Sequence, residues 1–307
     1  MPSALCVRTG GLGDLLLLRR AVSSLRGGGY DVCLLAPERH ASALLGPGGV
    51  ERVIDWEGAD VAALLRDDQP PDSPLIKRLR QCAVAIVYST SAPLVRAIAQ
   101  IVPDTVSHPP MPKGEVHAAM WYTQPVLAFA PTATEPLPFT PTPDERQHAD
   151  ELVGALPVRF LAIHPGSGSP SKNWPIARFA ALVHEVAQGA AWLLVEGPAE
   201  AGTLDALRKL PGARMASRLP PRVLGTVLSA AGAYVGNDSG VTHLAASWGA
   251  PTVALFGPTN PVHWAPVGPR VRVLAAPSGA LSAITVGEVV RVVSHFRRGD
   301  AMRVAHP

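Results

Sequence analysis

Short apolar segments, each followed by a turn and a longer helical pattern, recur along this chain, and this alternation is the strongest constraint on its fold. Strands are expected in the first half over 4–7, 30–35 and 83–88. Strands are expected in the second half over 159–164, 191–196, 233–236 and 252–256. Helices are expected between them over 14–25, 175–188, 199–209, 221–231 and 239–248. Strands that alternate with helices form parallel sheets with right-handed crossovers, so the pattern predicts the α/β class with doubly wound, Rossmann-like domains.

The length of the chain predicts two such domains. A chain of 307 residues fits two units of about 150 residues each. The pattern degrades over 103–143, and its last part is interpreted as a linker. We therefore expect domains over 1–143 and 144–280, followed by a C-terminal helical segment, 281–307, that packs back on the N-terminal domain. Ligands are expected at the carboxyl ends of the strands, where the two domains face a cleft.

Charge and cysteine usage exclude several classes of function. The net charge of +3 is too small for a nucleic-acid-binding surface, although it suits an anionic ligand or contact with a membrane surface. Cys6, Cys33 and Cys82 are odd in number and form no CxxC motif, which indicates reduced thiols in a cytoplasmic protein. The N-terminus shows no signal-peptide pattern. We expect a cytoplasmic protein whose place of work could be the inner face of the membrane.

A glycine-containing turn, 8–14, directly follows the first expected strand. Glycines allow the backbone to turn sharply, and the following helix N-terminus favours anions. A dinucleotide-binding GxGxxG motif is not completed, because Leu16 stands where its third glycine belongs, although the acidic Glu38 follows the second strand. Asp14 has two interpretations: a carboxylate that accepts a proton from a sugar hydroxyl, or a helix N-cap.

A second loop, 164–175, also lies between a strand and a helix. Its small residues and hydroxyls, such as Ser167 and Gly168, can surround phosphate oxygens, and Lys172 adds a positive charge. The GxxxxGK[ST] spacing of a Walker P-loop is missing. The alternative interpretation is a Ser/Gly loop with a solvated lysine.

A third segment, 236–246, places a helix start just after a strand. The amide groups at that start would face a diphosphate, and the helix dipole would favour its negative charge. Asp238 or Ser239 could instead be a simple cap, and His243 could be a buried structural histidine. The turn at 256–261 follows the next strand and could line a nucleotide pocket, or could be turn chemistry alone.

Together, these segments resemble the bacterial heptosyltransferases of glycosyltransferase family nine. The resemblance rests on HPGS…K-x-WP at 164–175 and on GNDSG-x-x-HLAA…FGPT-x-P at 236–261, with a looser match at the Gly-Asp turn 13–14. It implies a GT-B fold in which the second domain binds the sugar donor and the first binds the acceptor. It also implies an ADP-heptose donor and transfer that inverts the anomeric centre without a metal or cofactor.

The resemblance assigns roles to individual residues. It implies that Asp14 is the catalytic base, and Gly11 and Gly13 are expected beside the acceptor. The residues expected to bind the donor are Ser167, Gly168, Lys172, Glu200, Asp238, Ser239, Gly240 and His243. The acceptor would be a hydroxyl-bearing glycan, glycolipid or small molecule. One departure is Arg20, which stands where the family usually has a proline.

Two alternative functions remain open from the sequence. A dinucleotide-dependent oxidoreductase would bind its cofactor at the turn 10–14. A non-catalytic protein that binds sugar nucleotides would hold the donor without releasing nucleoside diphosphate. A nicotinamide cofactor that shifts the melting temperature when nucleotide sugars do not would favour the oxidoreductase. Donor binding without any release of nucleoside diphosphate would favour the binding protein.

Overall fold

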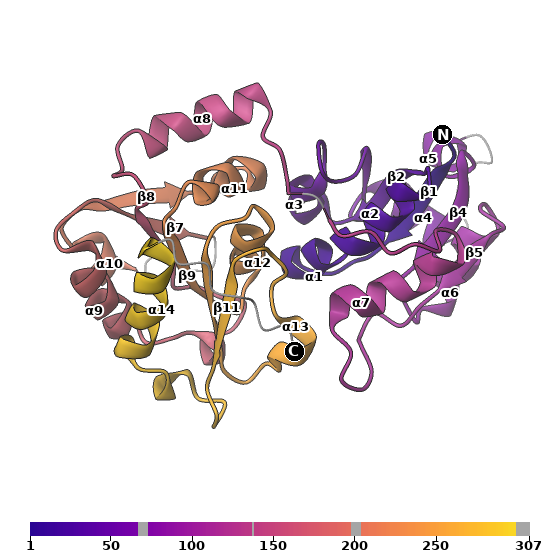
Figure 1. Ribbon diagram of the computed structural model, residues 1–307. Coiled ribbons are helices and arrows are strands. Elements are labelled where there is room, and N and C mark those ends of the chain that lie inside the picture. Colours follow the sequence, from indigo (N-terminus) through magenta and orange to yellow (C-terminus); the bar gives the residue numbers. More distant parts are fainter. Residues whose placement is uncertain (67–72, 137, 198–203, 299–307) are drawn as a thin grey trace. The chain divides into compact units, whose positions relative to one another are not determined.

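The computed structural model describes residues 1–66, 73–136, 138–197 and 204–298. Contacts divide the chain into two compact units, which are residues 1–140 (unit 1) and 141–307 (unit 2). Each unit contains one parallel sheet with helices on both faces (Figure 1). The α/β class predicted from the alternation of strands and helices is therefore confirmed.

The sheet of unit 1 has the order β3-β2-β1-β4-β5, and all of its pairings are parallel. Its strands are β1 (Ser3–Val7), β2 (Asp31–Ala36), β3 (Arg52–Asp55), β4 (Cys82–Val87) and β5 (Thr105–Ser107). The chain order reverses between β1 and β4, so the loops that follow these two strands flank the position where doubly wound sheets bind ligands.

The first helix of unit 1 differs from the single helix expected over 14–25. The chain forms α1 (Leu12–Leu17) and α2 (Arg19–Gly27), which meet at Leu18. The amide of Leu18 donates to the carbonyl of Leu15 at 3.1 Å, so the last turn of α1 is tightened. Such i→i+3 bonds are typical of helix ends, and this one interrupts a helix that the apolar pattern presents as continuous.

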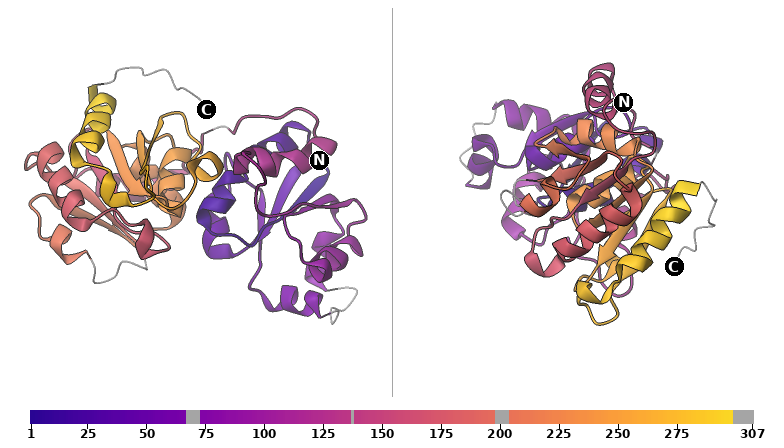
Figure 2. Two further views of the ribbon diagram at one scale, coloured as in Figure 1. Left: turned by 90° about the horizontal axis from the view of Figure 1, so that it is seen from below. Right: turned by 90° about the vertical axis from the view of Figure 1, so that its left-hand side faces the viewer.

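Helices cover both faces of the sheet in unit 1 (Figure 2). One face is covered by α4 (Ala59–Leu65), α5 (Pro74–Leu79) and α6 (Ala92–Ala99), whose apolar side chains share a core with β1, β2 and β4. On the other face, α2 packs against α7 (Ala118–Thr123). The short helix α3 (Glu38–Ala41) follows β2. The proline-rich stretch where the pattern degrades thus contains both β5 and α7.

The end of unit 1 runs along α2 and is held there by three side chains. The guanidinium of Arg20 pairs with Glu135 at 2.6 Å, and that of Arg19 lies 3.8 Å from the ring centroid of Phe139. The hydroxyl of Ser24 accepts from the amide of Thr134 at 3.0 Å. Arg20, the departure from the family pattern, therefore has a structural partner within its own unit.

The sheet of unit 2 has the order β11-β10-β9-β6-β7-β8, again with parallel pairings. Its strands are β6 (Leu161–His164), β7 (Trp192–Glu196), β8 (Ala213–Ser217), β9 (Ala233–Asn237), β10 (Thr252–Phe256) and β11 (Val271–Ala275). Counted along unit 2, this is the order 3-2-1-4-5-6 of a dinucleotide-binding Rossmann sheet. The order reverses between β6 and β9.

The helices of unit 2 also form two layers. Apolar side chains of α9 (Ile176–Ala187), α10 (Asp205–Arg208) and α14 (Val286–Arg298) join one core cluster with the sheet. On the other side are α11 (Pro221–Ser229) and α12 (Gly240–Ser247). Against α11 packs α8 (Pro143–Val153), where the buried Arg222 pairs with Glu145 at 2.6 Å.

The C-terminal helix was expected to form a separate segment that packs back on the N-terminal domain. In the structure, α14 packs on α9, β9 and β10 of unit 2. Its residues Val289 and Val293 are fully buried in the core of unit 2. The amphipathic pattern of 284–296 therefore predicted the helix, and its apolar stripe is covered by unit 2 itself.

Strands β3, β5, β8 and β11 were not predicted. All four lie at a sheet edge. Strand β5 has only three residues, and β3, β8 and β11 each carry an arginine. Edge strands are half exposed, so they lack the continuous apolar run that marks a buried parallel strand.

Candidate functional site

The carboxyl edge of the sheet in unit 2 brings two of the predicted loops together. Strands β6 and β9 are hydrogen-bonded neighbours, with His164 opposite Gly236 in register. The loop that follows β6 and the turn that follows β9 therefore leave the sheet side by side. Because the strand order reverses between these two strands, their ends border the position at which such sheets bind nucleotides.

Asn237, the last residue of β9, joins the two loops and is fully buried. Its side-chain oxygen accepts from the amide of Trp174 at 3.0 Å. Its side-chain nitrogen donates to the carbonyl of Pro165 at 2.6 Å. The sequence analysis assigned no role to Asn237. Its position at the end of a buried strand was a signal, because a buried carboxamide must find hydrogen-bond partners in the neighbouring loops.

The turn after β9 starts helix α12, close to the position expected from the sequence. Ser239 is the N-cap, and its hydroxyl accepts from the amide of Thr242 at 3.4 Å. The same hydroxyl lies 3.3 Å from Nδ1 of His164, at the end of β6. The first amides of a helix have no partner within it and carry the positive end of the helix dipole. This turn can therefore receive the oxygens of a diphosphate.

Close packing at the end of β9 leaves no room for a side chain at Gly236. A Cβ atom there would lie 2.7 Å from the hydroxyl oxygen of Thr242. That hydroxyl donates to the carbonyl of Asn237 at 2.5 Å and also contacts the hydroxyl of Tyr234 at 3.1 Å. Glycine is required here because the side chains of Tyr234 and Thr242 occupy the space that a Cβ would need.

The charged residues of this edge form a pair. Lys172, in the short helix η3 (Pro170–Lys172), places its Nζ 2.8 Å from Oδ2 of Asp238. The side chain of Lys172 is 33% exposed and that of Asp238 is 10% exposed. Nε2 of the buried His243 lies 4.0 Å from Oδ1 of the same carboxylate. The structure thus brings three of the predicted donor-binding residues together, with Lys172 held by a carboxylate.

Four further residues were predicted to bind the donor, namely Ser167, Gly168, Gly240 and Glu200. The hydroxyl of Ser167 donates to the carbonyl of Ser169 at 2.7 Å, so it stabilises the loop in this state. Gly168 is exposed, and a Cβ added there would meet no atom within 4 Å. Gly240 is the first residue of α12. Glu200 lies outside the residues that the structure describes.

In unit 1, Asp14 lies at the carboxyl edge of the sheet, after β1. It is the third residue of α1 rather than the N-cap, which is Gly11. Its Oδ2 accepts from the amide of Gly11 at 3.0 Å, and Gly13 lies within the same first turn. A Cβ at Gly10 would lie 2.6 Å from that of Asp14. Because the carboxylate itself occupies this helix start, the turn is poorly suited to a dinucleotide phosphate.

Two residues that the sequence analysis did not single out contact Asp14. Nη2 of Arg8 lies 2.7 Å from Oδ1 of Asp14 and donates to the hydroxyl of Tyr122 at 3.0 Å. Tyr122 lies in α7, and its hydroxyl is 3.4 Å from the same Oδ1. Arg8 could have been suspected, since it is a charged residue directly after a buried strand. Tyr122 carried no sequence signal, because only the fold brings α7 to this edge.

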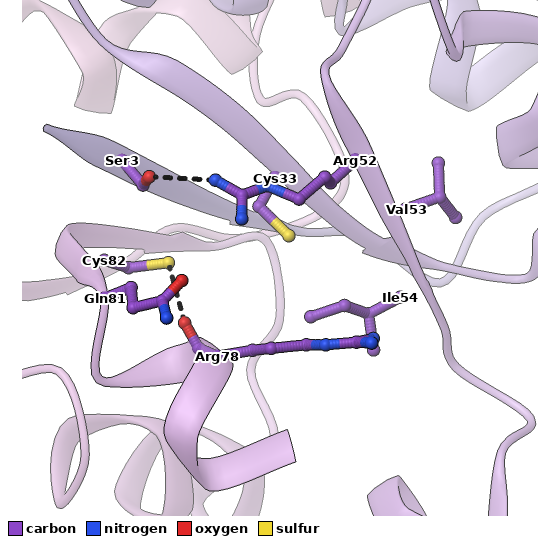
Figure 3. Close-up of a pocket in the computed structure, with 8 residues that line it drawn as sticks. All are labelled: Ser3, Cys33, Arg52, Val53, Ile54, Arg78, Gln81 and Cys82. Carbon is purple, nitrogen blue, oxygen red and sulfur yellow. Dashed lines mark hydrogen bonds between the residues drawn. The ribbon is translucent and has the colours of Figure 1, made fainter. Parts of the chain in front are cut away.

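A cavity of about 290 Å³ in unit 1 lies away from these residues. It opens near the start of β1, β3 and β4, and it is lined by Ser3, Cys33, Arg52, Val53, Ile54, Arg78, Gln81 and Cys82 (Figure 3). Its two guanidinium groups do not converge, because Arg52 extends toward Ser3 while Arg78 extends beneath Ile54. Burial raises the pKa of the Cys33 thiol to about 11, so this thiol is protonated at neutral pH. The cavity thus lacks the converging polar groups of a ligand site.

Among residues 1–66, 73–136, 138–197 and 204–298, no group of three or more His, Cys, Asp or Glu side chains is arranged to hold a metal ion. Within the same residues, no helix is long and apolar enough to cross a membrane.

Solved structures of similar fold define the class of this protein. A glycosyltransferase family 9 structure from Veillonella parvula superposes with a TM-score of 0.80 at 18% identity, covering 97% of this chain and 98% of that one. The Escherichia coli heptosyltransferase WaaC with ADP superposes with a TM-score of 0.73 at 19% identity, covering 96% and 99%. The protein has the GT-B fold, which consists of two Rossmann-like units.

Part of the sequence is similar to a known family. The profile of glycosyltransferase family 9 (heptosyltransferase) matches residues 134–285. Lipooligosaccharide heptosyltransferase 2 of Haemophilus influenzae is 28% identical over 47% of this chain, and the match spans 43% of that relative. Lipopolysaccharide heptosyltransferase 2 of E. coli is 25% identical over 85% of this chain and 69% of that relative. The resemblance to the heptosyltransferases of this family, which the motifs predicted, is confirmed.

Proposed function

We propose that this protein is an inverting glycosyltransferase that moves a heptose from an ADP-linked donor to a hydroxyl of a glycan, glycolipid or small-molecule acceptor. The observation that carries the proposal is the carboxyl edge of unit 2. There, the start of α12 and a partly exposed lysine lie beside the point where the strand order reverses. The WaaC structures with ADP and with ADP-2-deoxy-2-fluoro heptose support an ADP-linked donor.

The donor diphosphate would be held by amides and by one ammonium group. In the structure, Lys172 pairs with Asp238 at 2.8 Å. A diphosphate bound at this edge would pair with the ammonium group of Lys172 in competition with Asp238. The amides at Ser239 and Gly240 would bind further phosphate oxygens. These fixed groups would stabilise the charge that grows on the leaving ADP, which is the role that we propose they play in place of a metal ion.

The transfer itself would be a single displacement. The acceptor oxygen forms a bond to the anomeric carbon while the bond from that carbon to the β-phosphate oxygen breaks, and ADP leaves with the electron pair. Asp14 would accept the hydroxyl proton. The charge balances because one proton moves to the carboxylate as one negative charge moves to ADP. Attack from the face opposite to ADP inverts the anomeric centre.

Binding tests the donor half of the proposal. We expect ADP and ADP-heptose to raise the melting temperature, whereas UDP and GDP should leave it unchanged. A nicotinamide dinucleotide that stabilises the protein while ADP-sugars do not would instead favour the oxidoreductase. Donor binding without any release of ADP, across acceptors that include Kdo2–lipid A, would favour the non-catalytic binding protein.

Replacement of the base tests the catalytic half. Asp14→Asn should lower the rate of ADP release in the presence of acceptor at least about 10²-fold. ADP should still raise the melting temperature of this variant. Asp104→Asn, an exposed aspartate of the same unit, is the matched control and should keep its activity. Unchanged turnover in Asp14→Asn would exclude this residue as the base.

A further inference from the structure

Arg8 is an unusual residue in unit 1 because its charge is buried beside the carboxylate assigned as the base. It follows β1 directly and is 7% exposed. A buried cation is unfavourable unless hydrogen-bonded partners compensate for the lost water. Nη2 of Arg8 has two such partners, Oδ1 of Asp14 at 2.7 Å and the hydroxyl of Tyr122 at 3.0 Å. Arg8 therefore links the turn after β1 to α7.

Tyr122 completes this link from a distant part of the chain. Its side chain is fully buried, and its hydroxyl donates to the carbonyl of Pro110 at 3.1 Å. The Arg8 guanidinium lies 5.4 Å from the centroid of its ring. Burial raises the pKa of Tyr122 to about 12, so the hydroxyl remains neutral at physiological pH. A neutral hydroxyl can accept from Arg8 and donate to a carbonyl at the same time.

These contacts fix the plane of the Asp14 carboxylate. Arg8 binds Oδ1, whereas the amide of Gly11 binds Oδ2 at 3.0 Å. Rotation of the carboxylate about its terminal bond would break both interactions. The side chain nevertheless remains 28% exposed, so lone pairs of its oxygens stay open to solvent. A base needs this combination, because a proton acceptor must be oriented and also reachable.

We propose that Arg8 and Tyr122 are positioning residues that hold the Asp14 carboxylate in the orientation from which it accepts the acceptor's proton. Arg8 acts on the carboxylate directly, and Tyr122 acts mainly by fixing Arg8. This inference rests on the proposed function, since it gives the orientation of Asp14 a catalytic purpose. The competing interpretation is an ion pair that only stabilises unit 1, although buried ion pairs contribute little net stability to a fold.

A matched pair of tyrosines separates the two interpretations. Tyr88 is as buried as Tyr122, and their rings meet edge to face with centroids 5.3 Å apart. The hydroxyl of Tyr88 also donates to a backbone carbonyl, that of Tyr122, at 2.6 Å. Tyr88→Phe and Tyr122→Phe therefore each remove one buried hydroxyl from the same cluster, and the hydroxyl lost in Tyr122→Phe is the one that contacts Arg8.

The experiment compares the two variants in transfer from ADP-heptose to the acceptor that the wild-type protein uses. We expect Tyr122→Phe to lower kcat roughly tenfold with little change in the donor KM, because the base is misoriented while donor binding is intact. Tyr88→Phe should stay within about twofold of the wild type in kcat. Both variants should show similar decreases in melting temperature.

Arg8 supplies a second readout, which a merely structural role would not change. In Arg8→Gln, loss of the group that orients the carboxylate should lower kcat roughly tenfold with little change in the donor KM. Arg8→Lys, which keeps the charge and a donor, should recover part of that loss. If Arg8→Gln does not fold, Arg8→Lys and the tyrosine pair still decide the question.

The outcomes distinguish this inference from the proposed function. Absence of transfer by the wild-type protein, or full activity of Asp14→Asn, would refute the proposed function. If transfer occurs and depends on Asp14, equal kcat values for Tyr122→Phe and Tyr88→Phe would overturn the positioning role alone. A wild-type kcat in Arg8→Gln would overturn the role of Arg8.

Discussion

Each unit has an ion pair at the point of its sheet where the strand order reverses, and these two pairs are built differently. In unit 1, Arg8 is buried, and the carboxylate of Asp14 has further donors around it. In unit 2, Lys172 is one-third exposed (33%) and reaches Asp238 from a short 3-10 helix. The first arrangement fixes a carboxylate in place. The second leaves an ammonium group that can exchange its carboxylate for a phosphate.

The difference follows from the chemistry of the two cations. Arginine has a planar group with several donors, which can bind two partners at once, whereas lysine is a point charge on a flexible stem. In unit 2 the rigid element is instead Asn237, which is neutral and joins the two loops through both ends of its carboxamide. The cation that holds a carboxylate in place is thus an arginine, and the cation that can exchange its partner is a lysine.

The largest expected effect tests whether the Arg8–Asp14 pair contributes more to the free energy of unfolding than the Lys172–Asp238 pair. Arg8→Met should lower the free energy of unfolding by about 2–3 kcal/mol, because it leaves a partly buried carboxylate without its cation. Lys172→Met, the same change in unit 2, should cost less, about 1 kcal/mol, because Lys172 is itself one-third exposed (33%) and Nε2 of His243 lies 4.0 Å from the carboxylate that remains. Chemical denaturation of both variants measures this contrast, and equal losses would contradict it.

The next effect concerns the rigid support of unit 2. Asn237→Ala should lower the free energy of unfolding by about 2 kcal/mol, because the amide of Trp174 and the carbonyl of Pro165 would lose a buried partner. Asn260→Ala is the control, since Asn260 makes a similar bond to Val262 at an exposed position. ADP binding should also weaken in Asn237→Ala. Similar stability of the two variants would show that the loops hold together without the carboxamide.

A smaller effect measures the exchange of partners by Lys172. Lys172→Met should weaken ADP binding about tenfold, and the remaining binding should depend less on salt. Titration calorimetry at two salt concentrations measures both quantities. Lys209→Met, which removes an exposed lysine of the same unit, should bind ADP as the wild type does. Wild-type affinity in Lys172→Met would leave the ammonium group without a role in donor binding.

The smallest effect concerns the buried thiol of Cys6 in β1. Burial raises the pKa of this thiol to about 12. Below pH 9 the thiol is neutral in both the folded and the unfolded state. Above that pH it ionises only when unfolded, so stability falls as pH rises toward 12. We expect Cys6 to contribute about 1 kcal/mol of loss between pH 8 and 10. Denaturation of Cys6→Ala at both pH values should show a smaller decrease than that of Val7→Ala, which also truncates a buried residue of β1.

The buried strands and the motif positions could be predicted from the sequence, because their signals are local. An apolar run such as 252–256 is a buried parallel strand regardless of what surrounds it. The helix start at Ser239 follows from a capping residue directly after a strand. For the same reason, the edge strand β5 was missed, and so was the break at Leu18, where the apolar pattern continues without interruption.

The contacts within the candidate site could not be predicted, because they depend on residues far apart in the chain. Tyr122 reaches Asp14 across 108 positions, and Asn237 reaches Trp174 across 63. Neither tyrosine nor asparagine has a signature that marks such a partner. Asp14 was interpreted as a base or as an N-cap, and it is placed at the third position of α1, where it binds the N-cap amide from within the helix.

The chain is fastened on both sides of the boundary between the two units. Thr134, Glu135 and Phe139 contact α2, and Thr142 begins α8 with a reciprocal capping box. Pro141 lies just before that helix, and its ring fixes its φ angle. The first residues of unit 2 are therefore held as firmly as the last residues of unit 1, so neither terminal segment needs the other unit to stay in place.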